Sequence, residues 1–432
     1  MKTGLVLSGG GAKGAYEAGA YKALLELGYH FDIVTGTSIG ALNGLLITQH
    51  DEAKMYHMWE NLSVEQVLAE PIVIKGGIAE MLDQRNLLKS FFKSYLNEKG
   101  ADITPLKQLC LGLYDGEAAQ QSNIDYGIVT VKYPSLKPLE ITKKEMNKDD
   151  MLDYAFASAS CFPAFPVYHI GDEGYIDGGY FDNVPIALAI EMGADEIIAI
   201  ELNQQVTHSY YQDRPNITII TPSRSLGDFL DFDNASCNYR MRTGYNDIMK
   251  KYGKYHGFLY TFNPPLVNVK KQKVIYKHIL RVENNYNRKY LKKMFKTNAA
   301  IPISNYLKHR NLSTHLNLAD YYYLSLETLM TLLDYPIDAI YDPRVVVKEI
   351  VNEFKTYLVD YQSNDDKHLL SLQRLKDNLS ERSNREAIID YLKELHFNQA
   401  FDLTGISEAQ LPAYIGALFI ESELSNEHTG RK

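Results

Sequence analysis

The pentapeptide Gly36-Thr37-Ser38-Ile39-Gly40 constrains this chain more than any other feature of its sequence. It stands within residues 34–44, where apolar residues lead into the pentapeptide and small residues follow it. Glycine on both sides of Ser38 suits a strand that turns sharply into a helix, because a side chain there would collide with neighbouring backbone. The helix N-terminus at Ser38 would favour a developing negative charge. The pentapeptide therefore predicts a serine nucleophile on an α/β scaffold.

A glycine loop stands shortly before this turn. Residues 4–8 predict a short buried strand, the loop Gly9-Gly10-Gly11-Ala12-Lys13-Gly14 follows at once, and residues 15–27 carry apolar or small side chains at helical spacing. Residues 31–35 predict the strand that leads to Ser38. Two strand-loop-helix units this close together predict a mainly parallel sheet that is covered by helices.

Three interpretations fit the glycine loop. The backbone N–H groups of Gly9, Gly10 and Gly11 can form an oxyanion hole for an ester carbonyl that Ser38 attacks. The loop also fits the G-x-G-x-x-G fingerprint of dinucleotide sites, but that site needs an acid at the end of the second strand, and Asp32 stands at its start. A tight turn that binds nothing is the third. We favour the oxyanion hole because adjacent glycines cost conformational entropy on folding.

Asp177, followed by Gly178 and Gly179, is the candidate general base. A serine hydroxyl is a poor nucleophile until a base takes its proton, and a carboxylate in a dry site can do so. Asp-Gly is also a common turn, so these residues alone leave a turn-forming role open. The chain has twelve histidines, and His169 is the closest before Asp177. None stands in a comparable motif, although a triad must be recognised by geometry.

Four segments, in this order and spacing, resemble the patatin-like phospholipase family: residues 9–14, 36–44, 157–166 and 177–185. The resemblance covers about residues 1–245. It implies a three-layer α/β fold with Ser38 as nucleophile, Asp177 as base, and oxyanion donors in the loop of Gly9, Gly10 and Gly11. It further implies hydrolysis of lipid acyl esters, of the phospholipase A or lysophospholipase type, without a metal or cofactor. The supporting residues of the motifs are Lys13, Gly14, Gly36, Gly40, Gly178 and Gly179.

Other functions stay open at this point. A lipid-binding or regulatory protein can keep the same fold without turnover, since fold and motif do not prove activity. An oxidoreductase that binds a nucleotide is disfavoured by the missing ribose-binding acid. Acyl transfer to an alcohol cannot be separated from hydrolysis on these residues.

Residues 246–432 predict a second region that is mostly helical. From residue 250 to 310 the chain carries fifteen Lys or Arg against one acid, Glu283, so this segment has a charge of +14 and the remainder −9 − 14 = −23. Aromatic residues are interleaved with the basic ones. We favour contact with an anionic membrane for this segment, while ion pairing with the acidic remainder stays open. Nucleic acid is not an expected partner, because no recognition motif accompanies the charge.

The composition is that of an ordinary globular protein, and no run reaches the roughly 18 apolar residues of a membrane span. The apolar stretch after Met1 is too short for a signal peptide. We expect a cytoplasmic protein, peripheral at the membrane where the basic segment binds lipid. Cys110, Cys161 and Cys237 are expected to be reduced. Met and aromatic stripes at 55–62 and 81–95 favour helices that pack on the sheet, with a lid as the alternative.

Overall fold

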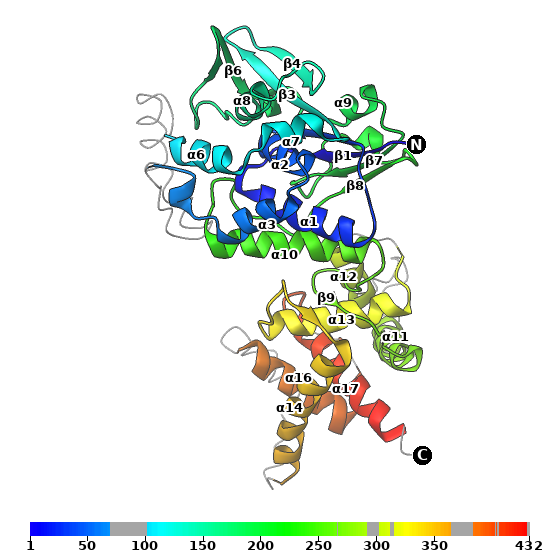
Figure 1. Ribbon diagram of the computed structural model, residues 1–432. Coiled ribbons are helices and arrows are strands. Elements are labelled where there is room, and N and C mark those ends of the chain that lie inside the picture. Colours follow the sequence, from blue (N-terminus) through cyan, green and yellow to red (C-terminus); the bar gives the residue numbers. More distant parts are fainter. Residues whose placement is uncertain are drawn as a thin grey trace. The chain divides into compact units, whose positions relative to one another are not determined.

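The computed structural model divides into two compact units, Met1–Met249 and Lys250–Lys432. It describes residues 1–69, 102–265, 267–291, 302–311, 315–363, 383–401, 403 and 406–429 (Figure 1). The predicted helical stripe at 81–95 lies outside the described residues. The sequence predicts a catalytic domain at residues 1–245 and a C-terminal region at 246–432, and this assignment of a catalytic domain stays a prediction.

The first unit is built on an eight-stranded sheet in the order β5-β6-β3-β2-β1-β7-β8, with β4 also paired to β3. The five strands β3, β2, β1, β7 and β8 are parallel, whereas β4, β5 and β6 are antiparallel to their neighbours. The predicted α/β fold with a mainly parallel sheet is confirmed. The strands are β1 (Thr3–Leu7), β2 (Ile33–Thr37), β3 (Asp125–Tyr133), β4 (Lys137–Thr142), β5 (Tyr168–Ile170), β6 (Glu173–Asp177), β7 (Glu196–Ile200) and β8 (Ile217–Ile220).

The ends of β2 and β6 meet beside β3. Strand β2 pairs with β3 as far as Thr37 opposite Val129, and β6 pairs with the next part of β3, where Asp177 lies opposite Thr130. Strand β4 occupies the other edge of β3 over both stretches. Strands β2 and β6 therefore follow one another along a single edge of β3, and the residues at their ends become neighbours.

Helices cover both faces of this sheet (Figure 1). Because side chains alternate along a strand, Val6 packs with Ile186 and Ala189 of α9 on one face, while Leu7 lies near Gly44 of α2 on the other. This gives the predicted three layers. The helices are α1 (Gly14–Glu26), α2 (Ile39–Thr48), α3 (Glu52–Asn61), α6 (Thr104–Leu113), α7 (Gly116–Gln121), α8 (Asp150–Ser158), α9 (Ile186–Glu191) and α10 (Asn234–Lys251).

The second unit is helical, as predicted, around a core that includes Tyr322, Phe354, Leu392 and Phe419. A short parallel pair, β9 (Thr261–Phe262) and β10 (Ile340–Tyr341), joins two of its loops. Among the described residues, no helix combines the length and apolarity needed to cross a bilayer. The helices of the second unit are α11 (Val269–Leu291), α12 (Pro302–Asn311), α13 (Leu318–Leu332), α14 (Pro343–Ser363), α16 (Asn384–Asn398) and α17 (Leu411–Thr429).

Candidate active site

Ser38 lies at the tip of the turn between β2 and α2, half-buried and with φ 56° and ψ −124°. Positive φ is costly for a residue with a side chain and persists where surrounding contacts fix it. The Ser38 N–H donates to Ser158 Oγ (2.9 Å), whose hydroxyl donates to the Val129 carbonyl (2.6 Å). A Cβ on Gly40 would come 2.4 Å from the Leu7 carbonyl oxygen, and one on Gly36 would meet the Gly40 carbonyl. The flanking glycines therefore let the turn close over the end of β1.

Asp177 ends β6 and is 6% exposed. Its carboxylate accepts a hydrogen bond from the Gly179 N–H (2.7 Å) and lies close enough to the Ser38 hydroxyl for that hydroxyl to lower its pKa. Burial raises the pKa of Asp177 to about 6, and the Ser38 hydroxyl and the Gly179 amide oppose that rise. Gly178 packs so closely on β3 that a Cβ would come 2.0 Å from the Val129 carbonyl oxygen. The structure thus brings the predicted nucleophile and base together through the meeting of β2 and β6.

The glycine loop follows β1 at the same edge of the sheet. Asn183 holds Gly9 twice: the Gly9 N–H donates to its carbonyl (3.1 Å) and its Nδ2 donates to the Gly9 carbonyl (3.2 Å). A Cβ on Gly9 would lie 3.2 Å from the Ser38 Cβ, so the loop passes directly beside Ser38. Within the described residues, no hydrogen bond uses the amides of Gly10 and Gly11. These two remain candidates for the oxyanion hole, whereas the Gly9 amide is engaged by Asn183.

Lys13 and Gly14 lie just after these donors. Lys13 closes a short 3-10 turn. Burial lowers its pKa, and the nearby Asp228 carboxylate offsets part of this lowering. The Gly14 carbonyl, at the start of α1, accepts a hydrogen bond from Asn43 Nδ2 (3.0 Å). Asp32 accepts the Thr3 N–H (2.8 Å) at the opposite end of β2 from Ser38. The second strand therefore supplies no acid at its end near the glycine loop, where the dinucleotide interpretation needs one.

An apolar pocket opens beside Ser38 within the first unit, enclosing about 730 Å³ of space that includes solvent at its mouth. Asn43 and Gly11 contribute to its wall, and the remaining lining is dominated by aliphatic and aromatic side chains. The stripe predicted at 55–62 supplies part of this wall as well as core packing. Apolar lining residues include Ile39, Leu42, Leu46, Met58, Trp59, Leu62, Leu106, Phe165 and Phe232.

A network of hydrogen bonds among buried side chains includes two residues of the pocket wall, Asn43 and Trp59. Asn43 on α2 donates to the Glu17 carboxyl (2.9 Å) and accepts the indole N–H of Trp59 (2.9 Å). Glu17 is 1% exposed, and burial raises its pKa well above the usual range. This network ties α1, α2 and α3 together, and α2 is the helix that follows Ser38.

Sequence reasoning missed Ser158 and Asn183 as individual residues, although both lie in motifs that it selected, at 157–166 and 177–185. Their roles depend on which backbone groups approach them, and spacing does not reveal this. His169 is exposed on β5, and His208 is bonded to Asp182 (2.9 Å). Over the described part of the chain, no three His, Cys, Asp or Glu residues gather as a metal site would need.

Comparison with known proteins agrees with the motifs. Residues 5–190 match the family model described as patatin-like phospholipase. Patatin-like phospholipase domain-containing protein 6 of Homo sapiens is 28% identical over 210 residues, which are 46% of this chain and 13% of that protein. Lysophospholipase NTE1 of Mycosarcoma maydis is 28% identical over 204 residues, 47% of this chain and 10% of that protein. The match thus spans a small part of these relatives' length.

Two solved structures align at low similarity. VipD from Legionella pneumophila gives a TM-score of 0.39 at 14% identity, covering 98% of this chain and 90% of VipD. The type III effector protein ExoU gives 0.30 at 14% identity, covering 91% and 80%. Neither alignment bears on the site. The motifs and the geometry around Ser38 agree with the family match, and residues 5–190 of this chain are similar to patatin-like phospholipases.

Proposed function

We propose that this protein is a serine lipid acyl hydrolase that cleaves fatty acyl esters through Ser38 and Asp177. One observation carries the proposal: the Ser38 hydroxyl lies beside the buried Asp177 carboxylate and lines an apolar pocket. A nucleophile needs an adjacent base, and an acyl chain needs an apolar wall. Both requirements are met at one turn of the chain.

The first half of the reaction forms an acyl-enzyme. Asp177 takes the Ser38 proton as Oγ attacks the ester carbonyl carbon, and the amides of Gly10 and Gly11 hold the resulting oxyanion. The carbon-oxygen bond to the alcohol then breaks, and Asp177 returns the proton to the leaving lysolipid or alcohol. In the second half Asp177 deprotonates a water that attacks the acyl carbonyl. The fatty acid leaves and Ser38 regains its proton.

The environment of Asp177 suits a base that works near neutral pH. With its pKa raised to about 6, the carboxyl is ionised at pH 7 and is a stronger base than an exposed aspartate. The hydrogen bond from the Gly179 N–H fixes the carboxylate relative to Ser38. The proposed dyad therefore needs no histidine.

We also propose that α11 contacts an anionic membrane and brings the enzyme to its substrate. One face of this helix is apolar and buried, at Ile275, Ile279 and Val282. The opposite face exposes basic residues at helical spacing, and in the described part of the chain no ion pair involves them. Each Lys or Arg near an anionic surface contributes about 1 kcal/mol. This basic face consists of Lys270, Lys273, Lys277 and Arg288.

The test of the hydrolase combines labelling by a fluorescent fluorophosphonate with release of fatty acid from phospholipid and lysophospholipid vesicles. Wild type should label and turn over, Ser38→Ala should do neither, and Asp177→Asn should do both far more slowly. A folded wild type that binds the vesicles yet neither labels nor releases fatty acid would contradict the proposal and favour a lipid-binding protein without turnover.

A further inference from the structure

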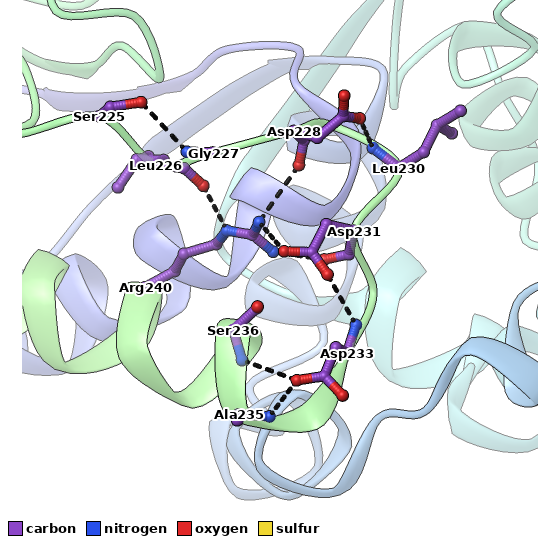
Figure 2. Close-up of polar contacts among 10 residues, drawn as sticks. All are labelled: Ser225, Leu226, Gly227, Asp228, Leu230, Asp231, Asp233, Ala235, Ser236 and Arg240. Carbon is purple, nitrogen blue, oxygen red and sulfur yellow. Dashed lines mark hydrogen bonds and ion pairs between the residues drawn. The ribbon is translucent and has the colours of Figure 1, made fainter. Parts of the chain in front are cut away.

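Arg240 of α10 is a fully buried arginine, 1% exposed, that lies outside the part of the chain matched to the family. Its guanidinium donates to the Leu226 carbonyl from Nε (2.7 Å), to the Asp228 carbonyl from Nη2 (3.2 Å), and to the Asp231 carbonyl from Nη1. Nη2 also forms an ion pair with the Asp231 carboxylate (2.9 Å). Figure 2 shows all four contacts converging from one short segment, residues 226–231.

The segment 226–231 holds the glycine loop in turn. The Phe229 carbonyl accepts the Ala12 N–H (2.7 Å). Gly11 has φ +57°, and a Cβ there would come 2.3 Å from the same carbonyl oxygen. A residue with a side chain at this position would clash and adopt a disfavoured backbone conformation. Phe229 therefore holds Ala12, the residue next to the candidate oxyanion donors, and lies against the donor Gly11 itself.

The neighbouring residues of the segment reach the same site. Phe232 lines the apolar pocket beside Ser38. Burial lowers the pKa of Lys13 in the glycine loop, and the nearby Asp228 carboxylate offsets part of this lowering. Local bonds stabilise the turn itself: Asp228 Oδ1 accepts the Leu230 N–H (2.8 Å), and Asp233 accepts the amides of Ala235 and Ser236 (Figure 2). The first bond lies within the segment and the Asp233 bonds cap the N-terminus of α10, whereas Arg240 binds residues 226–231 from further along the helix.

We infer that Arg240 is a positioning residue for the oxyanion hole, and this inference rests on the proposed hydrolase function. It anchors segment 226–231 to α10, so that the Phe229 carbonyl holds the Ala12 N–H and orients the amides of Gly10 and Gly11. Arginine suits this role because its planar guanidinium presents several donors in a fixed fork, which lysine cannot reproduce. Three main-chain carbonyls in different directions need such a fork.

The effect on the reaction follows from geometry. Amides that stabilise an oxyanion must point at the place where the charge develops, and a displacement of about 1 Å can cost a hundredfold in rate. Substrate binding depends mainly on the pocket, which is lined by several other elements. Loss of Arg240 should therefore lower kcat with little change in KM.

The experiment compares Arg240→Met with Arg242→Met, which removes the same charge from an exposed position of the same helix. Arg240→Met is expected to lower kcat and the rate of fluorophosphonate labelling by about ten- to a hundredfold, with KM within about threefold. Hydrogen-deuterium exchange should become faster in peptides that contain residues 9–14 and 226–231. Arg242→Met should behave as wild type in each measurement.

Two further variants keep the test decisive if Arg240→Met does not fold. Arg240→Lys keeps the charge and should show a smaller loss of kcat with the same change in exchange. Asp231→Asn keeps the carbonyl that Arg240 binds and should stay within about threefold of wild type. Wild-type kcat, or unchanged exchange at residues 9–14, in a folded Arg240 variant would overturn the inference. A wild type without activity would refute the hydrolase instead, while the exchange comparison would still decide whether Arg240 holds the glycine loop.

Discussion

The two units of this protein bury carboxylates in different ways. Asp177 in the first unit accepts one backbone amide and faces the Ser38 hydroxyl beside an apolar pocket. Glu327 of α13, in the second unit, is equally buried but accepts the amides of Phe258, Leu259 and Tyr260 at 2.6, 3.1 and 3.3 Å. Burial raises the pKa of both groups. Burial alone therefore does not identify a catalytic base, and the partners of the carboxylate do.

Two other buried acids of the second unit join helices to one another. Glu283 accepts the amide and hydroxyl of Ser304, and Glu423 pairs with Lys271. The Glu283 bonds join α11 to α12, and the Glu423 pair joins α17 to α11. We interpret these carboxylates as structural, in contrast to Asp177.

The largest expected difference is between Asp177→Asn and Glu327→Gln. Asp177→Asn should lower kcat by about 10⁴-fold, because the neutral amide cannot take the Ser38 proton. Glu327→Gln should leave kcat within about twofold but lower the free energy of unfolding by about 1–3 kcal/mol, since it weakens bonds to buried amides. Rates of fatty acid release and urea unfolding measure the two effects. Equal losses of activity would remove the distinction between the units.

Two glycines of the first unit, both with positive φ, sharpen the contrast between site and scaffold. Gly11→Ala meets the Phe229 carbonyl and should lower kcat by about a hundredfold or more. Gly28→Ala meets nothing within 4 Å and should leave kcat unchanged while costing about 1 kcal/mol of stability. Kinetics with a soluble ester, at a temperature where both variants are folded, separates the two. Full activity of Gly11→Ala would argue against an oxyanion hole in this loop.

The basic face of α11 should matter for membranes and not for chemistry. Changing Lys270, Lys273 and Lys277 to Gln should weaken binding to vesicles that contain phosphatidylserine by about a hundredfold, at about 1 kcal/mol for each lysine. Binding to neutral phosphatidylcholine vesicles and hydrolysis of a soluble ester should be unchanged. The control changes three exposed lysines of the first unit, Lys22, Lys137 and Lys144, to Gln. Co-sedimentation in which both triple variants lose binding equally would contradict a specific role for α11.

The smallest effect concerns the stability cost of the proposed base. The folded pKa of Asp177, about 6, lies above its usual value of 3.8. The contribution of this group to stability is therefore greatest below its usual pKa and is lost as the pH rises through about 6. At neutral pH, Asp177→Asn removes a buried charge and should raise the free energy of unfolding by about 1–2 kcal/mol. Calorimetry that finds a less stable variant at neutral pH would contradict this assignment of the charge.

The sequence predicted the first unit better than the second, for a physical reason. A tight turn such as the one at Ser38 needs glycine at fixed positions, so it leaves a local pattern in the chain. The meeting of β2 and β6 leaves no such pattern, because it depends on pairing with β3 about 90 residues from Ser38. The sequence reveals the motif at 177–185, but it does not predict that β6 runs antiparallel to β3.

Arg240 illustrates what sequence reasoning cannot reach. An arginine in a polar helix is usually exposed, and only the fold places segment 226–231 around it. The same limit applies to Gly9, whose amide is engaged by Asn183 from a distant motif. In α11 the charge excess was visible in the sequence, but its concentration on one exposed face required the helix boundaries.

The pH dependence of labelling at Ser38 tests the central claim most directly. Intact-protein and peptide mass spectrometry would follow fluorophosphonate attachment between about pH 8 and about pH 5. Since Asp177 must be ionised to accept the proton, the rate of labelling should fall about tenfold for each pH unit below pH 6. All of the adduct should be on Ser38. Asp177→Asn should react slowly and without this dependence. A wild-type rate that stays constant down to about pH 5, or an adduct on another residue, would contradict the proposed dyad.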